Sequence, residues 1–248
     1  MVTIEKDTTT DQRSAELAVY VDALGAQLYG VAPAEMYEEH FPAKPSPRQF
    51  VPKARSVVII GMPFTRGVMT TVLKHELAGL RPKPGEELSG DKVPVRGAER
   101  FFLDPENDML DHEVALIAYK IARYVEGKGY SAMHLPTEKK SDRRFWTAPF
   151  YHMPAMYLAG LGTMGLNASI ITPEYGPRVW VTSVITDMEL RPGRPMTEDV
   201  CTSCGLCVEN CPVSALDGEG WKDVYKCSAY GCCATCIAIC PVGEGAGC

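Results

Sequence analysis

The sequence predicts an α/β (α+β) protein in two parts, a large N-terminal domain of residues 1–194 and a small cysteine-rich domain of residues 195–248. Three observations support this prediction. Helix-like apolar stripes and short β-branched runs are interspersed along the N-terminal part. All ten cysteines lie between Cys201 and Cys248. A linker-like segment, Arg191-Pro-Gly-Arg-Pro195, stands just before the first of them.

Three stretches have the pattern of helices. In residues 11–29 apolar side chains recur at spacings of 4, 3 and 4, and Gly30 provides a stop. In residues 111–126 one face is apolar and two glycines follow, and residues 153–161 form a short apolar helix. Residues 80–108 are rich in Pro, Gly and charge, which is typical of a long loop.

Three β-branched runs predict strands. They occupy residues 56–61, 169–172 and 179–186. The second and third are joined by Pro173-Glu-Tyr-Gly176, a sequence typical of a turn. The chain is therefore expected to contain both helices and strands, which favours a mixed α/β core.

The composition of the chain argues against several classes of function. The chain has a net charge of −6 and a pI near 5.5, so it has no general attraction for a phosphate backbone, and we expect no nucleic-acid partner. No apolar run is long enough to span a membrane, and the first residues contain neither an apolar core nor a twin arginine. We therefore expect a cytoplasmic protein. Cysteines clustered in such a chain indicate metal binding in a reducing compartment.

The cysteines form two related motifs. The first is Cys201-x2-Cys204-x2-Cys207-x3-Cys211-Pro212, the spacing of bacterial ferredoxins, in which the fourth cysteine crosses to the other cluster. The second is Cys233-x2-Cys236-x3-Cys240-Pro241, with Cys227 upstream. The spacing predicts two 4Fe–4S clusters in a ferredoxin-like domain. Cluster one would be held by Cys201, Cys204, Cys207 and Cys240, and cluster two by Cys211, Cys227, Cys233 and Cys236.

Two of the ten cysteines are not assigned to a cluster, and the identity of one ligand of cluster two stays open. Cys232 could replace Cys233, because spacing alone cannot rank adjacent cysteines, and Cys248 has no assigned role. Zinc sites also use C-x2-C pairs. A zinc ion needs only four ligands, however, so it gives no reason for a third cysteine at the same spacing followed by x3-Cys-Pro.

The N-terminal domain resembles a known family. The blocks Ala159-Gly-Leu-Gly-Thr-Met-Gly-Leu-Asn167, Ile170-Ile-Thr-Pro-Glu-Tyr-Gly-Pro-Arg178 and Thr186-Asp-Met-Glu-Leu190 resemble the region before the first cluster in reductive dehalogenases. They are similar, more loosely, to epoxyqueuosine reductases. Trp221 and Lys226-Cys-Ser-Ala-Tyr230 look like the segment between the clusters in these families. Ala54-Arg-Ser-Val-Val-Ile-Ile60 matches their first core strand.

This resemblance implies a nitroreductase-like domain that holds base-off cobalamin, with two 4Fe–4S clusters passing electrons to cobalt. It implies cofactor contacts from the glycine-rich block, namely Gly160, Leu161, Gly162, Gly165 and Asn167, because glycine permits close backbone approach. A helix end followed by a turn would explain the same glycines. FMN is the alternative cofactor. The expected partners are a ferredoxin or flavodoxin as electron donor and a small organic substrate.

Two departures from the related families limit the substrate. Aligning Ala148-Pro149 with the Ala-Pro of epoxyqueuosine reductases puts Trp146 at the position of their catalytic aspartate and His152 at that of a glutamate. We also expect neither the C-terminal repeat domain that often serves tRNA in those enzymes nor the leader of respiratory dehalogenases. Epoxyqueuosine is therefore not the expected substrate, and dehalogenation stays a candidate activity.

Five residues are candidates for proton delivery or anion binding. His112, beside Asp111, falls near the position of the dehalogenase tyrosine, and histidine is the residue type that commonly transfers protons near neutral pH. Tyr151 and His152 form a second pair, and Arg178 roughly matches a basic position of the family. Solvent-facing positions for His112 and Arg178, and core packing for the pair, are the structural alternatives.

The sequence thus predicts a cobalamin-dependent iron–sulfur reductase, similar to reductive dehalogenases, that acts on a small organic molecule. One alternative is an electron-transfer iron–sulfur protein that docks a partner enzyme. Another is a cobalamin-binding or cobalamin-handling protein without substrate chemistry of its own. The short front domain also suggests a homodimer that completes the cofactor site.

Overall fold

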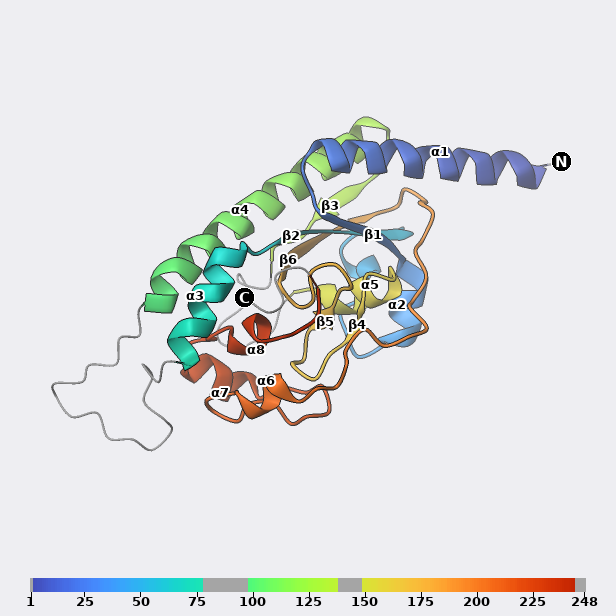
Figure 1. The fold of residues 1–248 in the computed structure, drawn as a ribbon. Coiled ribbons are helices and arrows are strands. Elements are labelled where there is room, and N and C mark those ends of the chain that lie inside the picture. The colour runs from blue at the N-terminus through green and yellow to red at the C-terminus, as the bar shows by residue number, and fades with distance from the viewer. Residues whose placement is uncertain (1, 78–97, 138–148, 244–248) are drawn as a thin grey trace. The chain divides into compact units, whose positions relative to one another are not determined.

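The computed structural model describes residues 2–77, 98–137 and 149–243, shown in colour in Figure 1. The chain forms two compact units that interleave along the sequence. The first unit comprises Met1–Met62, Asp111–Leu161 and Trp180–Thr197, and the second comprises Pro63–Leu110, Gly162–Val179 and Glu198–Cys248. The two domains predicted from the sequence follow one another along the chain, with a boundary at residue 194. This division stays a prediction.

A four-stranded sheet forms the centre of the first unit. Its strands run in the order β1 (Leu28–Pro33), β2 (Ser56–Pro63), β6 (Val179–Thr186) and β3 (Ala132–His134). β1 pairs antiparallel with β2, and β3 pairs antiparallel with β6. The first six residues of β2 are all buried, as expected for a central strand covered on both faces.

Helices cover both faces of this sheet (Figure 1). α1 (Val2–Ala23) and the C-terminal part of α4 (Ala98–Gly127) lie on one face, and α2 (Ala34–His40) and α5 (His152–Leu158) lie on the other. A short 3-10 turn, η1 (Pro47–Gln49), follows α2. The apolar stripe of α4 enters the core between α1 and the sheet, together with Leu17, Val31, Ile60 and Val184. The helix predicted at residues 111–126 is therefore confirmed.

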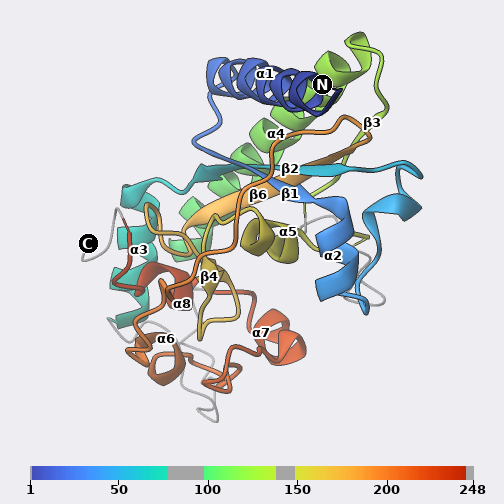
Figure 2. The same cartoon turned by 90° about the vertical axis from the view of Figure 1, so that its right-hand side faces the viewer.

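The second unit contains short elements joined by loops, visible in Figure 2. They are α3 (Arg66–Leu77), the hairpin of β4 (Thr163–Met164) and β5 (Ile170–Ile171), and three one-turn to two-turn helices, α6 (Leu206–Glu209), α7 (Val224–Ala229) and α8 (Thr235–Ala238). α8 contacts both α3 and α6. All nine cysteines that the structure describes belong to this unit.

Two predictions about secondary structure need correction. The helix predicted at residues 11–29 ends at Ala23, and Gly30 lies inside β1 rather than at a helix end. Gly30 fits there because its Cα faces Ala159 and Leu161, where a Cβ atom would lie only 3.0 Å away. The loop predicted at residues 80–108 is helical from Ala98 onward, although the helix includes Pro105. Residues 80–97 lie outside the described part of the chain.

The remaining predicted elements are present, with shifted ends. The helix predicted at 153–161 is α5, which ends at Leu158, and the strand predicted at 169–172 is the two-residue β5. The strand predicted at 179–186 agrees with β6. None of the described helices combines the length and apolarity that crossing a membrane would require.

Candidate metal centre

Cysteines from both motifs line one cavity in the second unit. Cys201 and Cys204 reach it from the loop that leads into α6, Cys207 reaches it from α6 itself, and Cys240 reaches it from the segment after α8. Cys236 borders the same cavity. The other side chains around it are mainly apolar. Thus the thiols that the sequence assigned to cluster one surround a common space, although the last one is far from the others along the chain.

The two Cys-x2-Cys segments have the same backbone conformation. Ser203 and Gly205, on either side of Cys204, have positive φ values of 52° and 77°. Cys232 and Ala234, on either side of Cys233, have φ values of 53° and 61°. A short helix starts after the second of these residues in each segment. The chain therefore matches Cys233 with Cys204, and Cys232 with the non-ligand Ser203.

Such left-handed conformations are uncommon for residues other than glycine. Ser203, Cys232 and Ala234 all adopt them, and strained residues of this kind cluster at functional sites. Here they flank Cys204 in the first motif and Cys233 in the second.

Contacts of the second motif bear on Cys232 and Cys233. The buried hydroxyl of Thr235 donates to Sγ of Cys233 at 3.2 Å. Cys232 is exposed, lies 3.7 Å from the hydroxyl of Ser228, and also hydrogen-bonds Cys227. Proximity to Cys227 alone would therefore favour Cys232 as the ligand, whereas the repeated backbone conformation favours Cys233. Thr235 was not singled out from the sequence, although a hydroxyl two residues after a candidate ligand was visible there.

Burial raises the pKa of several of these thiols. It raises the pKa of Cys236 to about 12, and it also raises the pKa values of Cys207 and Cys240. The pKa of Cys227 is raised first by its hydrogen bond with Cys232 and then by burial. Backbone N–H groups act in the opposite direction at Cys207 and Cys240. Since thiolates are the ligands of iron, assembly of a cluster would release protons from these sites.

Within the residues described, no three His, Cys, Asp or Glu side chains converge on one point as a mononuclear metal site requires. A cubane 4Fe–4S cluster requires a different arrangement, because each thiolate binds a separate iron at its own corner.

The block from Gly162 to Arg178 supports the cysteine loops. Thr163 Oγ1 accepts a hydrogen bond from the backbone N–H of Val200, directly before Cys201, at 2.8 Å. Thr172 Oγ1 donates to the carbonyl of Gly176 at 3.1 Å and accepts from the N–H of Tyr175 at 3.1 Å, which closes the predicted turn. Gly176 has a φ of 59°, and a Cβ atom there would overlap the carbonyl of Val242.

Arg178 ends this block and is almost fully buried, with 2% of its surface exposed. Its Nη1 donates to the carbonyl oxygens of Cys240 at 2.8 Å and Ile237 at 3.3 Å, and its Nη2 donates to that of Val242. The guanidinium therefore holds the chain on both sides of Cys240. Its positive charge also acts against the rise in the pKa of that thiol.

The glycines predicted to contact a cofactor lie against the chain itself. A Cβ atom on Gly160 would overlap the carbonyl of Arg194, and one on Gly162 would overlap the carbonyl of Ile171. A Cβ atom on Gly165 would lie 2.5 Å from the side chain of Ile171. These close approaches to the chain itself explain why the three positions are glycines, and a cofactor is not needed for this explanation. Contact with a cofactor stays a prediction for all five residues of the block.

The pair Tyr151 and His152 opens α5 in the first unit. His152 is 1% exposed, with Nδ1 2.9 Å from the hydroxyl of Ser183 and Nε2 3.1 Å from the carbonyl of Pro136. Because that carbonyl can only accept, Nε2 carries the proton of the neutral ring. Burial lowers the pKa of His152 to about 4. Tyr151 is half-buried, and Lys44 Nζ lies 4.1 Å above its ring.

His112 and Asp111 are neighbours in α4 with opposite environments. His112 is exposed, whereas Asp111 is 7% exposed and accepts a hydrogen bond from the hydroxyl of Thr137. Both lie well inside the helix rather than in its first turn, because α4 begins at Ala98. Trp146 and Cys248 lie outside the described residues.

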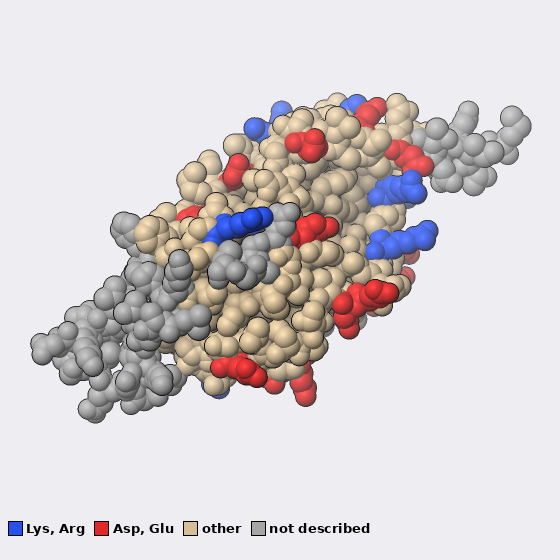
Figure 3. All heavy atoms as spheres, in the orientation of Figure 1, with Lys and Arg blue, Asp and Glu red and all other residues tan. Residues whose placement is uncertain are grey.

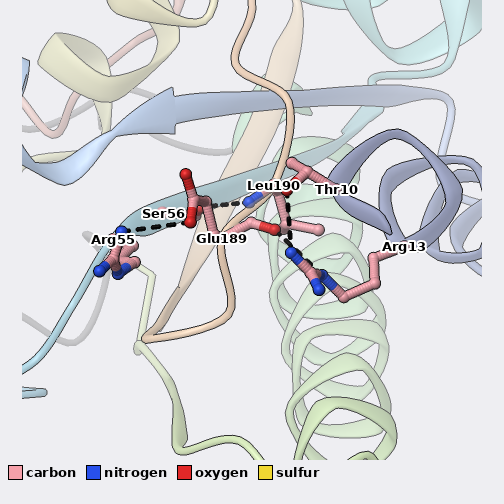
Figure 4. A network of polar contacts seen from close by, with 6 residues as sticks. All are labelled: Thr10, Arg13, Arg55, Ser56, Glu189 and Leu190. Atoms are coloured by element: carbon pink, nitrogen blue, oxygen red, sulfur yellow. Dashed lines mark hydrogen bonds and ion pairs between the residues drawn. The ribbon is translucent and has the colours of Figure 1, made fainter. Parts of the chain in front are cut away.

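A cleft of about 700 Å³ in the first unit contains none of the predicted site residues. Arg55 and Glu189 form an ion pair of 3.2 Å at its wall, and Ser56 Oγ accepts from the N–H of Leu190 at 3.1 Å. Arg13 adds hydrogen bonds to the carbonyl of Glu189 and to Thr10 (Figure 4). On the face drawn in Figure 3, acidic and basic side chains of the described residues are likewise interspersed.

Comparison with known proteins agrees with the cysteine spacing. A family model described as "4Fe-4S binding domain" matches residues 196–217. Epoxyqueuosine reductase of Bacillus anthracis is 37% identical over 108 residues, in an alignment that covers 35% of this chain and 28% of that enzyme. Tetrachloroethene reductive dehalogenase of Sulfurospirillum multivorans is 33% identical over 112 residues, covering 35% of this chain and 22% of that one.

The chain is homologous to both groups of reductases. It is therefore related to the reductive dehalogenase and epoxyqueuosine reductase superfamily, as the sequence blocks indicated. The matched region spans less than a third of either relative's length.

Solved structures of both groups share the fold. An epoxyqueuosine reductase determined with a tRNA stem loop superposes with a TM-score of 0.60 at 19% identity, covering 95% of this chain and 66% of that one. A reductive dehalogenase described as performing B12-dependent dehalogenation gives 0.58 at 19% identity, covering 89% and 29%. At this identity the likeness concerns the fold, and it agrees with the mixed α/β class that the sequence predicted.

Proposed function

We propose that this chain is an iron–sulfur oxidoreductase that passes electrons through two 4Fe–4S clusters to a cobalamin and a small organic substrate. The observation that carries the proposal is the cavity that Cys240 shares with Cys201, Cys204 and Cys207. In two-cluster ferredoxin motifs the fourth cysteine of each run serves the other cluster, which is the pattern that this cavity would require.

The chemistry of the cavity suits an iron–sulfur cluster. Soft thiolates are the ligands that such clusters use, and the apolar side chains around the cavity, among them Ile171 and Val242, would keep water away from it. A bound cluster would accept and release single electrons. The cysteines would hold it, and the hydrogen bonds from Arg178 would fix the position of Cys240.

For the second cluster we propose Cys211, Cys227, Cys233 and Cys236 as ligands. Sγ of Cys211 accepts the backbone N–H of Ala215 at 3.2 Å, and Sγ of Cys233 accepts the hydroxyl of Thr235. Hydrogen bonds to sulfur are typical of cluster ligands and tune the reduction potential. Cys207, Cys211 and Cys233 all lie close enough to Cys236 to raise its pKa electrostatically, so the two ligand sets are neighbours.

The proposal of cobalamin rests on the relatives rather than on a site in this structure. A homologous fold belongs to an enzyme described as B12-dependent, and FMN is the alternative. The described contacts of Gly160 and Gly162 are with their own chain, so we derive no step through the corrin. A ferredoxin or flavodoxin is the proposed electron donor.

The substrate remains a proposal at the level of its class. We propose a small organic molecule. A related fold is solved with a tRNA stem loop, so a nucleic-acid substrate is the competing class. A net charge of −6 does not favour it. Proposed catalytic residues are His112 with Asp111, Tyr151 with His152, and Arg178. Of these, exposed His112 can exchange protons with solvent, whereas the ring nitrogens of His152 are both engaged.

The test is anaerobic reconstitution followed by metal analysis and spectroscopy. The proposal predicts about eight irons and eight sulfides per chain and, after reduction, an EPR spectrum of interacting spins. Titration with cob(II)alamin should then convert its EPR spectrum to the base-off form. Stoichiometric zinc without sulfide would exclude the clusters. Full clusters with retained flavin and no response to cobalamin would instead indicate the FMN alternative.

A further inference from the structure

Asn167 presents an unsatisfied hydrogen-bond donor at the cysteine cavity. The residue is 2% exposed and lines the same cavity as Cys201, Cys204, Cys207 and Cys240. Its Nδ2 atom is buried, and no partner for it exists in the described part of the chain. Buried side-chain donors in folded proteins nearly always have an acceptor, so we expect this amide to have one in the cluster-loaded protein.

The orientation of the Asn167 amide is fixed by the hairpin that carries it. Oδ1 accepts the backbone N–H of Ser169 at 3.2 Å in the loop between β4 and β5. That loop is closed by hydrogen bonds from Gly165 N to the carbonyl of Ser169 and from Ala168 N to that of Gly165. Exchanging the oxygen and nitrogen would set two donors against each other. The N–H₂ group is therefore the end that remains without a partner.

The side chains around the cavity offer one kind of acceptor for this donor. Apart from Thr202, which is exposed, the side chains that line it beside Asn167 are cysteines or apolar groups. Apolar side chains cannot accept a hydrogen bond. Sulfur can, both as a thiolate and as a cluster sulfide, and Thr235 Oγ1 already donates to the sulfur of Cys233 in the second motif.

We propose that Nδ2 of Asn167 donates a hydrogen bond to a sulfur atom of the cluster held by Cys201, Cys204, Cys207 and Cys240, and thereby raises its reduction potential. The inference rests on the ligand set of the proposed function. Reduction adds negative charge to the cluster and its sulfurs. A donor fixed at that point stabilises the reduced form more than the oxidised form, so the cluster accepts an electron at a higher potential.

The test uses two substitutions in the full-length, reconstituted protein. Asn167→Asp keeps an oxygen for the N–H of Ser169 but removes the donor, and Asn167→Leu removes the donor without adding charge. Redox titrations followed by EPR should show a more negative midpoint potential for one cluster in both variants. Thr235→Val is the matched control, because it removes a donor to Cys233 and should shift only the other cluster.

The outcomes separate this inference from the proposed function. Wild-type protein that assembles no clusters refutes the ligand assignment before any variant is measured. Intact clusters whose potentials are unchanged in both Asn167 variants overturn the inference alone, as does a shift confined to the Asp variant, which would report charge only. If neither variant holds iron, wild-type protein labelled with ¹⁵N in asparagine amides is reduced instead. Pulsed EPR should then detect ¹⁵N coupled to the cluster spin, and no coupling counts against the hydrogen bond.

Discussion

The guanidinium of Arg178 donates a hydrogen bond of 2.8 Å to the carbonyl oxygen of Cys240. Two further bonds, to Ile237 and Val242, fix the chain before and after this cysteine. The interaction joins a residue at the end of a turn to a candidate ligand 62 positions later. It gives Arg178 a positioning role that can be separated from the catalytic role expected from the sequence.

Replacing Arg178 by Ala should reduce both stability and iron content. Three part-buried carbonyls would lose their donor, and an acceptor left unpaired away from water costs up to about 1–3 kcal/mol. We expect a lower denaturant midpoint and less than half of the wild-type iron after reconstitution. Arg191→Ala is the control, because that side chain is 73% exposed and pairs only loosely with Asp11. Full iron content combined with lost turnover would instead favour the catalytic role.

Replacing Gly162 by Ala should destabilise the protein whether or not cobalamin is present. The added Cβ would overlap the carbonyl of Ile171, so the β4–β5 hairpin would have to open. We expect a loss of about 2 kcal/mol or more, as for other overpacked sites, seen as a lower thermal midpoint. In Gly67→Ala, the control, the new Cβ would meet nothing within 4 Å in α3, and a small gain is expected. Normal stability with weakened cobalamin binding would assign Gly162 to the cofactor.

Features that follow from local patterns in the sequence were predicted better than features that depend on distant residues. The spacing of the cysteines and the apolar face of residues 111–126 are local patterns, and both correspond to features of the structure. Gly30 shows why other features were not predicted from the sequence. It could end a helix by its backbone preference, but it lies in β1, where a Cβ atom would come within 3.0 Å of the side chains of Ala159 and Leu161. That requirement comes from residues distant in sequence.

The candidate site shows the same limit. Contact of Gly160, Leu161, Gly162, Gly165 and Asn167 with cobalamin stays a prediction, whereas the contacts of Thr163 and Arg178 with the cysteine loops were not expected from the sequence. Neither contact follows a local pattern, since each joins segments far apart in the chain. The ambiguity between Cys232 and Cys233 also could not be resolved from spacing, because it depends on backbone dihedral angles.

Replacing Cys233 by Ser should remove one cluster, whereas Cys232→Ser should leave both. The reason is the repeated conformation, in which Cys233 occupies the position of Cys204 and Cys232 that of Ser203. Iron analysis should give about four irons for the first variant and about eight for the second. The adjacent substitutions are matched in chemistry, so each controls for the other. The reverse result would make Cys232 the ligand and its contact with Cys227 part of the site.

Protein stability should fall between pH 6.5 and about pH 4 because of His152. Burial lowers the pKa of this ring to about 4 in the folded state, whereas the unfolded chain binds the proton near the usual value of 6.5. In that window the unfolded state holds more protons than the folded state, so acidification favours unfolding, and the contribution of His152 is fully present above pH 6.5. The total loss is about 3 kcal/mol, at about 1.4 kcal/mol per pH unit.

This prediction can be measured by denaturant unfolding at pH 7 and pH 5.5 under anaerobic conditions, in wild type and in His152→Gln. The variant should be less stable at pH 7, because the bonds of the ring to Ser183 and Pro136 are lost or weakened. It should also lose less stability on acidification than wild type does. His112→Gln is the control, because His112 is exposed and should leave the wild-type dependence on pH unchanged. Any acid sensitivity of the cysteine sites is common to all three proteins and cancels in the difference. An identical pH dependence in wild type and His152→Gln would mean that the ring can be protonated in the folded state, and it would restore His152 as a candidate proton donor.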